Sequence, residues 1–183
     1  MNDLRLLRQF VLDMGAFRTG VVNVDEIDFE PEFRKLCESN ACGLYGRNWM
    51  CPPDVGQVED LIARAKQFRW ALVFQTVNAL EDSYDVEGML AAGEEMNRLM
   101  DSVRQKLEEL GIRRRLLLGA GGCRICQCCA KASGQACRHP EQALSSLEAY
   151  GINVSVLASM AGMKYINGAN TVTFFGAVFL GEK

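Results

Sequence analysis

The sequence predicts an α/β fold in which a small mixed sheet is covered by helices and joined by cysteine-rich loops. Short apolar runs with β-branched and aromatic residues alternate with longer segments whose apolar residues recur every three or four positions. The eight cysteines are expected in the loops and not in the periodic segments, and a scaffold usually carries its chemistry on loops. No internal repeat or low-complexity linker divides the chain, so we expect one domain over residues 1–183.

Helices in the first half are expected where apolar residues share one face, and strands where short runs are β-branched or aromatic. Pro31 suits the first turn of a helix, and the carboxylate of Asp54 can cap one. The expected elements are a helix at Leu4–Gly15, a strand at Val21–Val24, a helix at Glu30–Glu38, a loop at Asn40–Pro53, a helix from Asp54 to Gln67 and a strand at Arg69–Val77.

The second half begins with a long amphipathic segment, and Gly111 suits the left-handed position that ends such a helix. Pro140 is expected to open another helix. The expected elements are a helix at Val86–Leu110, a strand at Arg114–Leu118, a cysteine-rich loop at Gly119–His139, a helix at Pro140–Tyr150 and strands at Val154–Leu157 and Thr171–Leu180.

Charge and hydropathy argue against two kinds of partner. The net charge is −3, so no broad basic surface for nucleic acid is expected. The basic run Arg113–Arg115 is interpreted as a solvated strand entrance, with a docking patch for an acidic protein as the alternative. The longest apolar run, in Thr171–Leu180, is too short to span a membrane. The amphipathic segment Met1–Phe17 does not resemble a signal peptide, so we expect a cytoplasmic protein.

Clustered cysteines in a reducing compartment are metal ligands or redox groups more often than disulfides. Seven of the eight fall into two spaced groups, and Cys128 is passed over because it adjoins another cysteine. The first group is Cys37, Cys42 and Cys51, spaced C-x4-C-x8-C and followed by two prolines; the second is Cys123, Cys126, Cys129 and Cys137, spaced C-x2-C-x2-C-x7-C.

This spacing favours an iron–sulfur cluster. Each iron of a [4Fe–4S] cluster needs one outside ligand, usually a thiolate, and a C-x2-C-x2-C loop can present three of them. Gly119, Gly121 and Gly122 precede the second group and let backbone N–H groups approach the inorganic sulfides. Zinc is the main alternative, although zinc knuckles usually pair two C-x2-C motifs a dozen or more residues apart. Redox thiols without metal are a third.

Seven thiolates would complete one cluster and leave three for a second. The eighth position would be open, or filled by His139 or another side chain; two closed clusters or a single cluster are equally open alternatives.

Other side chains near the cysteines have two interpretations each. His139 is also a candidate for a structural role at a helix start, and Glu148 for a solvent-facing or cluster-supporting carboxylate. Tyr45 and Trp49 would shield a cluster or simply pack. Arg124, Lys131 and Arg138 would offset cluster charge or be solvated.

Three segments resemble a known family. They are Cys42–Pro53 (CGLYGRNWMCPP), Gly122–Pro140 with its four spaced cysteines, and Ser146–Val154 (SLEAYGINV). They are similar to the signatures of predicted metal-binding proteins catalogued as a domain of unknown function, found mainly in anaerobic bacteria and archaea. The resemblance spans about residues 15–180. The resemblance implies metal binding of iron–sulfur type. It assigns the seven cysteines as ligands and leaves Cys128 outside the pattern. It implies no reaction.

Three functions follow as hypotheses. The first is an electron-transfer or redox accessory protein with one or two [4Fe–4S] clusters and a redox partner protein. The second is an enzyme that binds substrate at an open cluster iron. The third is a zinc-stabilised binding module. No phosphate-binding loop, dinucleotide fingerprint or histidine-based nucleophile pattern is present, and neither catalytic residues nor an oligomeric state are indicated.

Overall fold

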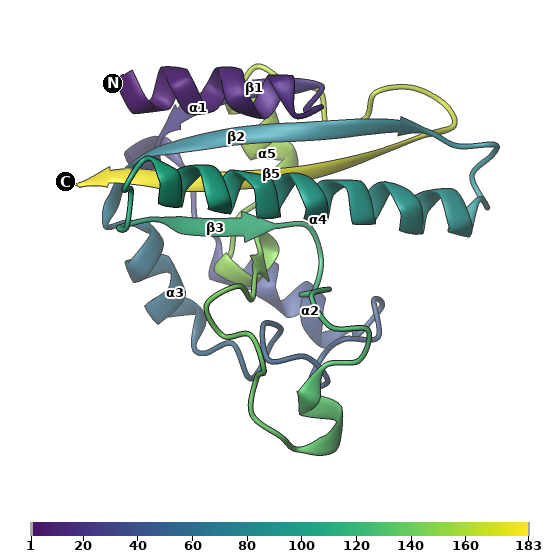
Figure 1. Cartoon of the computed structure of the whole chain (residues 1–183). Coiled ribbons are helices and arrows are strands. Elements are labelled where there is room, and N and C mark those ends of the chain that lie inside the picture. Colours follow the sequence, from purple (N-terminus) through teal and green to yellow (C-terminus); the bar gives the residue numbers. More distant parts are fainter. Residues whose placement is uncertain (1, 183) are drawn as a thin grey trace.

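A computed structural model describes residues 2–182 and places one mixed sheet at the centre of the chain (Figure 1). The strand order is β1-β2-β5-β3-β4, and every neighbouring pair is antiparallel except β3 with β4. The predicted α/β class with a small mixed sheet is therefore confirmed. The strands are β1 Arg18–Asn23, β2 Phe68–Ala79, β3 Leu116–Gly119, β4 Ser145–Ser146 and β5 Thr171–Glu182.

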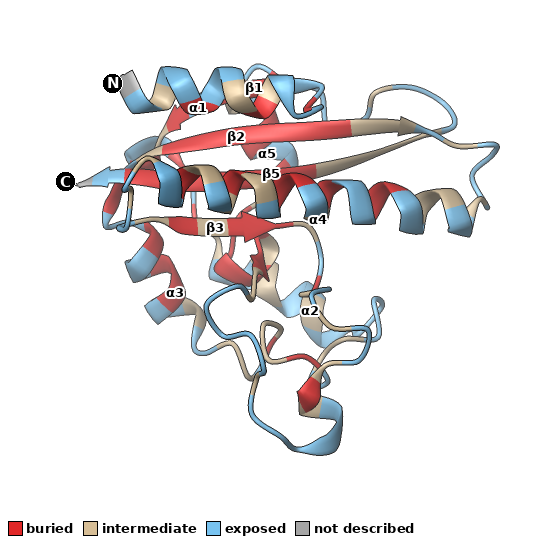
Figure 2. Ribbon diagram, in the orientation of Figure 1, coloured by how far each residue is buried: buried red, intermediate tan, exposed pale blue. Residues whose placement is uncertain are grey.

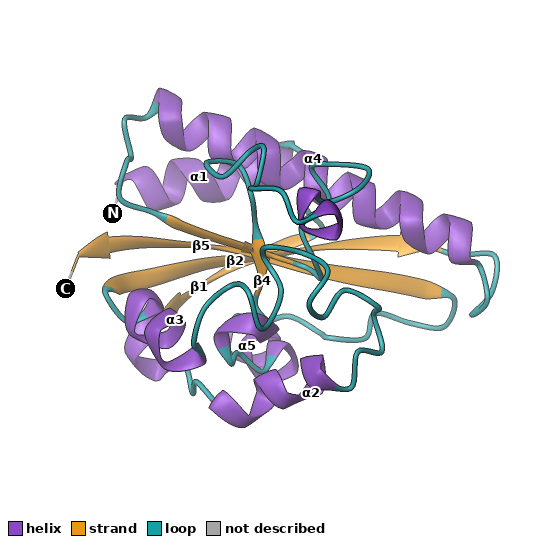
Figure 3. Cartoon of the chain, turned by 90° about the horizontal axis from the view of Figure 1, so that it is seen from below, coloured by secondary structure: helices purple, strands orange, loops and turns teal. Residues whose placement is uncertain are grey.

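Helices cover both faces of the sheet, which gives three layers (Figure 3). α1 and α4 lie on one face, and α2, α3 and α5 lie on the other. The α-helices are α1 Asn2–Asp13, α2 Lys35–Glu38, α3 Val58–Ala65, α4 Val86–Glu109 and α5 Val154–Met160; the 3-10 turns are η1 Val24–Glu26, η2 Pro31–Arg34, η3 Ala130–Ser133 and η4 Glu148–Tyr150. Among residues 2–182, none of the helices has the length and apolar character needed to cross a membrane.

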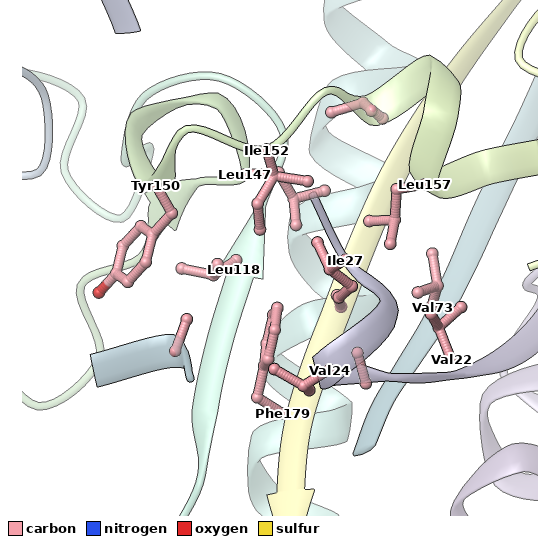
Figure 4. Packing of buried hydrophobic residues seen from close by; sticks show 14 of the residues in the cluster. Val22, Val24, Ile27, Val73, Leu118, Leu147, Tyr150, Ile152, Leu157 and Phe179 are labelled. Carbon is pink, nitrogen blue, oxygen red and sulfur yellow. The ribbon is translucent and has the colours of Figure 1, made fainter. Parts of the chain in front are cut away.

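Two hydrophobic cores hold these layers together (Figure 2). Under α1 and α4, Leu7 and Met100 pack against Leu72 and Phe74 of β2. Strand β2 is covered on both faces, because residues 71–76 are all buried, and this explains why it reads as a continuous apolar run. The opposite core contains Val22, Val24, Ile27, Val73, Leu118, Leu147, Tyr150, Ile152, Leu157 and Phe179 (Figure 4).

The longest predicted elements are confirmed. α4 matches the predicted helix, and Gly111 has φ +69° directly after it, as expected for a left-handed helix end. β2 and β5 match the predicted strands and pair with each other over almost their full length. β1 and β3 differ from the prediction only in their bounds. The segment Glu30–Glu38 forms η2 followed by α2, so Cys37 lies in a short helix and not in a loop.

Three local predictions were wrong. Pro140–Tyr150 is not a helix, because its middle forms β4 beside β3, a pairing that only the tertiary structure decides. Val154–Leu157 is helical, because the Asn153 side chain accepts hydrogen bonds from two N–H groups of the first turn. Asp54 does not cap a helix: α3 begins at Val58, and Asp54 pairs with Lys131.

The cysteine-rich loops lie together beyond the β3–β4 side of the sheet, at the bottom of Figure 1. The segment between α2 and α3 enters this region from one side. The segment between β3 and β4 enters it from the other, because the chain leaves the sheet at Gly119 and returns at Ser145. Two parts of the chain that are far apart in sequence therefore meet below the sheet.

Gly20 of β1 lies against the backbone of Ala161, the residue that follows α5. A Cβ at this position would lie 2.3 Å from the carbonyl oxygen of Ala161. Gly20→Ala should force β1 and α5 apart and destabilise the protein by about 1–3 kcal/mol, measured by urea unfolding at one fixed metal content. Val21→Thr, at an exposed position of the same strand, serves as the control and should change the stability by less than about 0.5 kcal/mol. Equal stability of Gly20→Ala and the parent would contradict this contact.

Candidate metal centre

The seven predicted ligands all lie in the region below the sheet, in two parts of the chain. We call residues 37–51 the first cysteine segment and residues 123–137 the second. Six of the seven cysteines are half-buried, Cys42 is exposed, and the passed-over Cys128 is exposed as well. No disulfide joins any of the eight. The thiols are therefore available as ligands at the boundary between the protein and solvent.

The two cysteine segments touch at Cys51. The charges of Cys37 and Cys42 reach its thiol from the same segment, and those of Cys123 and Cys129 reach it from the other. Gly122 makes this approach possible. A Cβ on Gly122 would lie 3.1 Å from the Cys51 sulfur and only 2.4 Å from a methyl carbon of Leu44. A side chain at position 122 would therefore displace the Leu44 side chain and crowd the Cys51 sulfur.

The four cysteines of the second segment share one small cavity. Cys123, Cys126, Cys129 and Cys137 all line it, and the first cysteine segment contributes Trp49 to its wall. The sequence spacing alone suggested that these four thiols act together, and the fold brings them to one space. The sulfurs also meet the donor chemistry that iron and zinc prefer.

Asn48 ties the two segments together. Its side chain is only 3% exposed, and its Nδ2 donates a hydrogen bond to the carbonyl oxygen of Cys123 at 2.9 Å. Its Oδ1 accepts the backbone N–H of Met50 at 3.0 Å, and its carbonyl accepts that of Cys51 at 3.0 Å. Sequence reasoning did not single out Asn48. An asparagine between two cysteines gives no signal that its amide reaches 75 positions along the chain.

A second polar connection closes the region on the Trp49 side. The Trp49 indole N–H donates to the carbonyl of Gln135 at 2.8 Å, and the Lys131 ammonium lies 4.4 Å from the Trp49 ring centroid. Lys131 also forms an ion pair with Asp54, in which both side chains are largely buried. These contacts fix Trp49 in the wall of the cavity that the four second-segment cysteines line, and its shielding of a cluster stays a prediction.

The turn at residues 120–122 and the first part of the second segment, up to residue 129, offer unused hydrogen-bond donors. Within the described residues, the backbone N–H groups of residues 120–129 donate no hydrogen bond. Buried or half-buried N–H groups normally find a partner. Groups of this kind suit the sulfides and thiolates of a metal cluster, which accept N–H hydrogen bonds. The glycines that precede Cys123 keep this stretch of backbone accessible.

Burial and crowding raise the pKa values of the first-segment thiols. Burial, followed by the charges of Cys42, Cys37 and the two nearest second-segment cysteines, raises the pKa of Cys51 to about 12. Burial and the carboxylate of Glu148 raise the pKa of Cys37. These thiols are therefore protonated at neutral pH without metal, and a bound cation must displace their protons.

Glu148 is half-buried in η4 and does not face solvent as a helix carboxylate would. Burial raises the pKa of Glu148, and hydrogen bonds from its own backbone and from Ser146 offset part of that shift. Its charge acts on Cys37. His139 is exposed, lies at the cavity of the second segment, and accepts two backbone N–H groups through its carbonyl.

The raised pKa of Cys51 predicts slow alkylation in the reduced, metal-free protein. At pH 8 the fraction of Cys51 present as thiolate is roughly a thousandfold below that of an ordinary cysteine. A thiolate of higher pKa is a stronger nucleophile, so the alkylation rate falls by less than the thiolate fraction does. Iodoacetamide should therefore modify Cys51 about 30–100-fold more slowly than a free-cysteine peptide, and the rate should rise as the pH approaches 12. Peptide mass spectrometry measures it, with exposed Cys128 as the internal control. Similar rates at Cys51 and Cys128 would contradict the burial.

Removal of the Asn48 amide should weaken metal binding. Asn48→Ala leaves the Cys123 carbonyl and the Met50 N–H without partners, at a cost of about 1–3 kcal/mol each if they stay buried. We expect less metal per chain by elemental analysis. The matched control is Asn167→Ala, which also removes an amide with two hydrogen bonds, donated to Lys164 and Thr173, but lies outside the cysteine segments. An equal loss of metal in both variants would show that Asn48 has no special role.

One family model covers both cysteine segments and nearly the whole sheet. It is described as "Predicted metal-binding protein (DUF2284)" and matches residues 20–180. No curated protein and no solved structure matches the chain. The chain therefore belongs to this family of predicted metal-binding proteins, whose function is unknown.

Proposed function

We propose that the chain is a cytoplasmic iron–sulfur protein that holds one or two [4Fe–4S] clusters and exchanges electrons with a redox partner protein. The observation that carries the proposal is the shared cavity of Cys123, Cys126, Cys129 and Cys137. Four thiolates match the four irons of one cluster. When bound, such a cluster accepts and releases single electrons.

The spacing of the side chains supports a cluster over a single zinc ion. A tetrahedral zinc site with bonds of about 2.3 Å needs its sulfurs about 3.8 Å apart. The spacing Cys123-x2-Cys126-x2-Cys129 puts the third cysteine only two residues after the second, which crowds a tetrahedral zinc knuckle. A cluster spreads its ligands over four irons and accepts wider spacing. The unused N–H groups of residues 120–129 support the same choice, because sulfides accept hydrogen bonds.

The first segment supplies three further thiolates, from Cys37, Cys42 and Cys51. They suffice for a second cluster with one position that no cysteine fills. The carboxylate of Glu148 acts on Cys37 and is the nearby candidate for an oxygen ligand. The close approach of Cys51 to Cys123 and Cys129 places this second group next to the first.

The residues around the thiols have roles that this function needs. Trp49 lines the cavity of the four second-segment thiols and would limit the access of water to a cluster there. Lys131, paired with Asp54, packs on the ring of Trp49 and thereby steadies this wall of the cavity. Cys42 and Cys128 reach the surface, so a partner that docks on this end comes close to the clusters. The net charge of −3 gives no support for a nucleic-acid partner.

An enzyme with substrate at an open iron is the second candidate. The observation that favours it is a cavity of about 530 Å³ with Cys123 in its wall. A pure electron carrier needs no such cavity. A zinc-stabilised binding module remains the alternative if the purified protein carries zinc.

The first test is purification without oxygen, followed by visible absorption and assays of iron, sulfide and zinc per chain. Two clusters give about eight irons with equal sulfide and a brown protein, and one cluster gives about four. Colourless protein with zinc would refute the redox proposal.

Single cysteine-to-alanine variants then identify the ligands. Replacement of any of the seven should lower the iron content, and loss of a second-segment cysteine should remove about four irons. Cys128→Ala is the matched control and should keep the full complement. Iron loss in Cys128→Ala similar to that in Cys129→Ala would overturn the ligand set.

A further inference from the structure

A cavity beside the predicted ligand Cys123 lies between α4 and the turn that follows β3. It has a volume of about 530 Å³, within the range of small-molecule sites. One wall is the α4 face that carries Asn97 and Asp101; the other is the turn at residues 119–122, which continues into Cys123. The proposed electron-transfer function does not use this cavity.

The turn presents bare backbone to the cavity. A Cβ on Gly119 or Gly121 would meet no atom within 4 Å, so both glycines border open space. Gly121 has φ +67°, a left-handed conformation that bends successive N–H groups toward one side. The N–H groups of residues 120–122 donate no hydrogen bond within the described residues. Unused amides at a left-handed turn form a site for an anion.

Arginines border the same cavity. Arg98, Arg104 and Arg124 line it, against the single carboxylate of Asp101. Arg104 is already paired with Asp101 and Glu108. Arg98 is mostly exposed and lies 3.9 Å from its nearest carboxylate, a weak surface pair that a ligand can displace. Arg98 and Arg124 are thus the cations that remain for a ligand.

We propose that this cavity binds a small organic molecule through a carboxylate or phosphate group, which the amides of residues 120–122 and the guanidinium of Arg98 hold. The wall at Cys123 would place the rest of the molecule beside the metal centre. The position beside the metal centre rests on the proposed function. For the second candidate, an enzyme with substrate at an open iron, the inference names the substrate class. The anion site itself consists of α4 and the glycine turn.

Isothermal titration calorimetry at constant ionic strength tests the proposal with defined probes. Inorganic phosphate and succinate represent the two sources of the anion, and succinamide is the neutral control. We expect phosphate, succinate or both to bind, with no binding of succinamide. Arg98→Gln should weaken binding about tenfold, as expected for one charge-assisted hydrogen bond. Arg5→Gln, on α1 and outside the cavity, removes the same charge and should change affinity less than twofold.

A second variant fills the cavity. Gly119→Val puts a side chain into the open space without backbone strain, because Gly119 does not have a positive φ. It should abolish binding while circular dichroism and unfolding stay close to the parent. Binding that persists in Gly119→Val, or falls equally in Arg98→Gln and Arg5→Gln, would overturn the proposal.

Iron and sulfide are assayed in every sample, and the titrations are repeated after removal of metal by a chelator. Anion binding that depends on Arg98, in protein that contains no iron when it is purified without oxygen, supports the site while the proposed function fails. A protein loaded with iron that binds neither phosphate nor succinate refutes the site while the proposed function stands. The two failures are therefore distinguishable.

Discussion

The hydrogen bond from Asn48 to the Cys123 carbonyl joins two loops that are 75 positions apart and that carry the candidate ligands. The bond forms inside the protein, where an unpaired amide would be costly, so the loops meet in one arrangement. Gly122 permits the contact, because any side chain there would collide with Leu44 and crowd the Cys51 sulfur. One amide and one missing side chain therefore bring the thiols of two segments to a common place.

The sheet supplies the rigidity that these loops lack. Both hydrophobic cores lie against its faces, and the cysteine segments contribute little to either of them. The second segment leaves from Gly119 of β3 and returns at β4, so its two ends are anchored by a parallel pair. Between these anchors the loops are held by polar contacts such as Lys131 with Asp54. In such a region a bound metal supplies part of the free energy that orders the chain.

The chemistry of the thiols follows from this placement. Half-burial with several like groups nearby favours the protonated thiols, so metal binding is coupled to proton release. The same turn that leads into Cys123 carries amides that donate no hydrogen bond within residues 2–182, and it also borders the cavity beside α4. A single stretch of bare backbone can thus serve a metal cluster and an anion next to it.

The sequence by itself determined the fold class, the long elements α4, β2 and β5, and the grouping of seven cysteines, because local periodicity and spacing encode these features. It did not determine the roles of Asn48 and Asp54 or the strand at β4. Each depends on partners distant in the chain: Cys123 for Asn48, Lys131 for Asp54, and β3 for β4. The cavity beneath α4 also lies between segments that only the tertiary structure brings together, because packing, and no local propensity, decides which loops share a space.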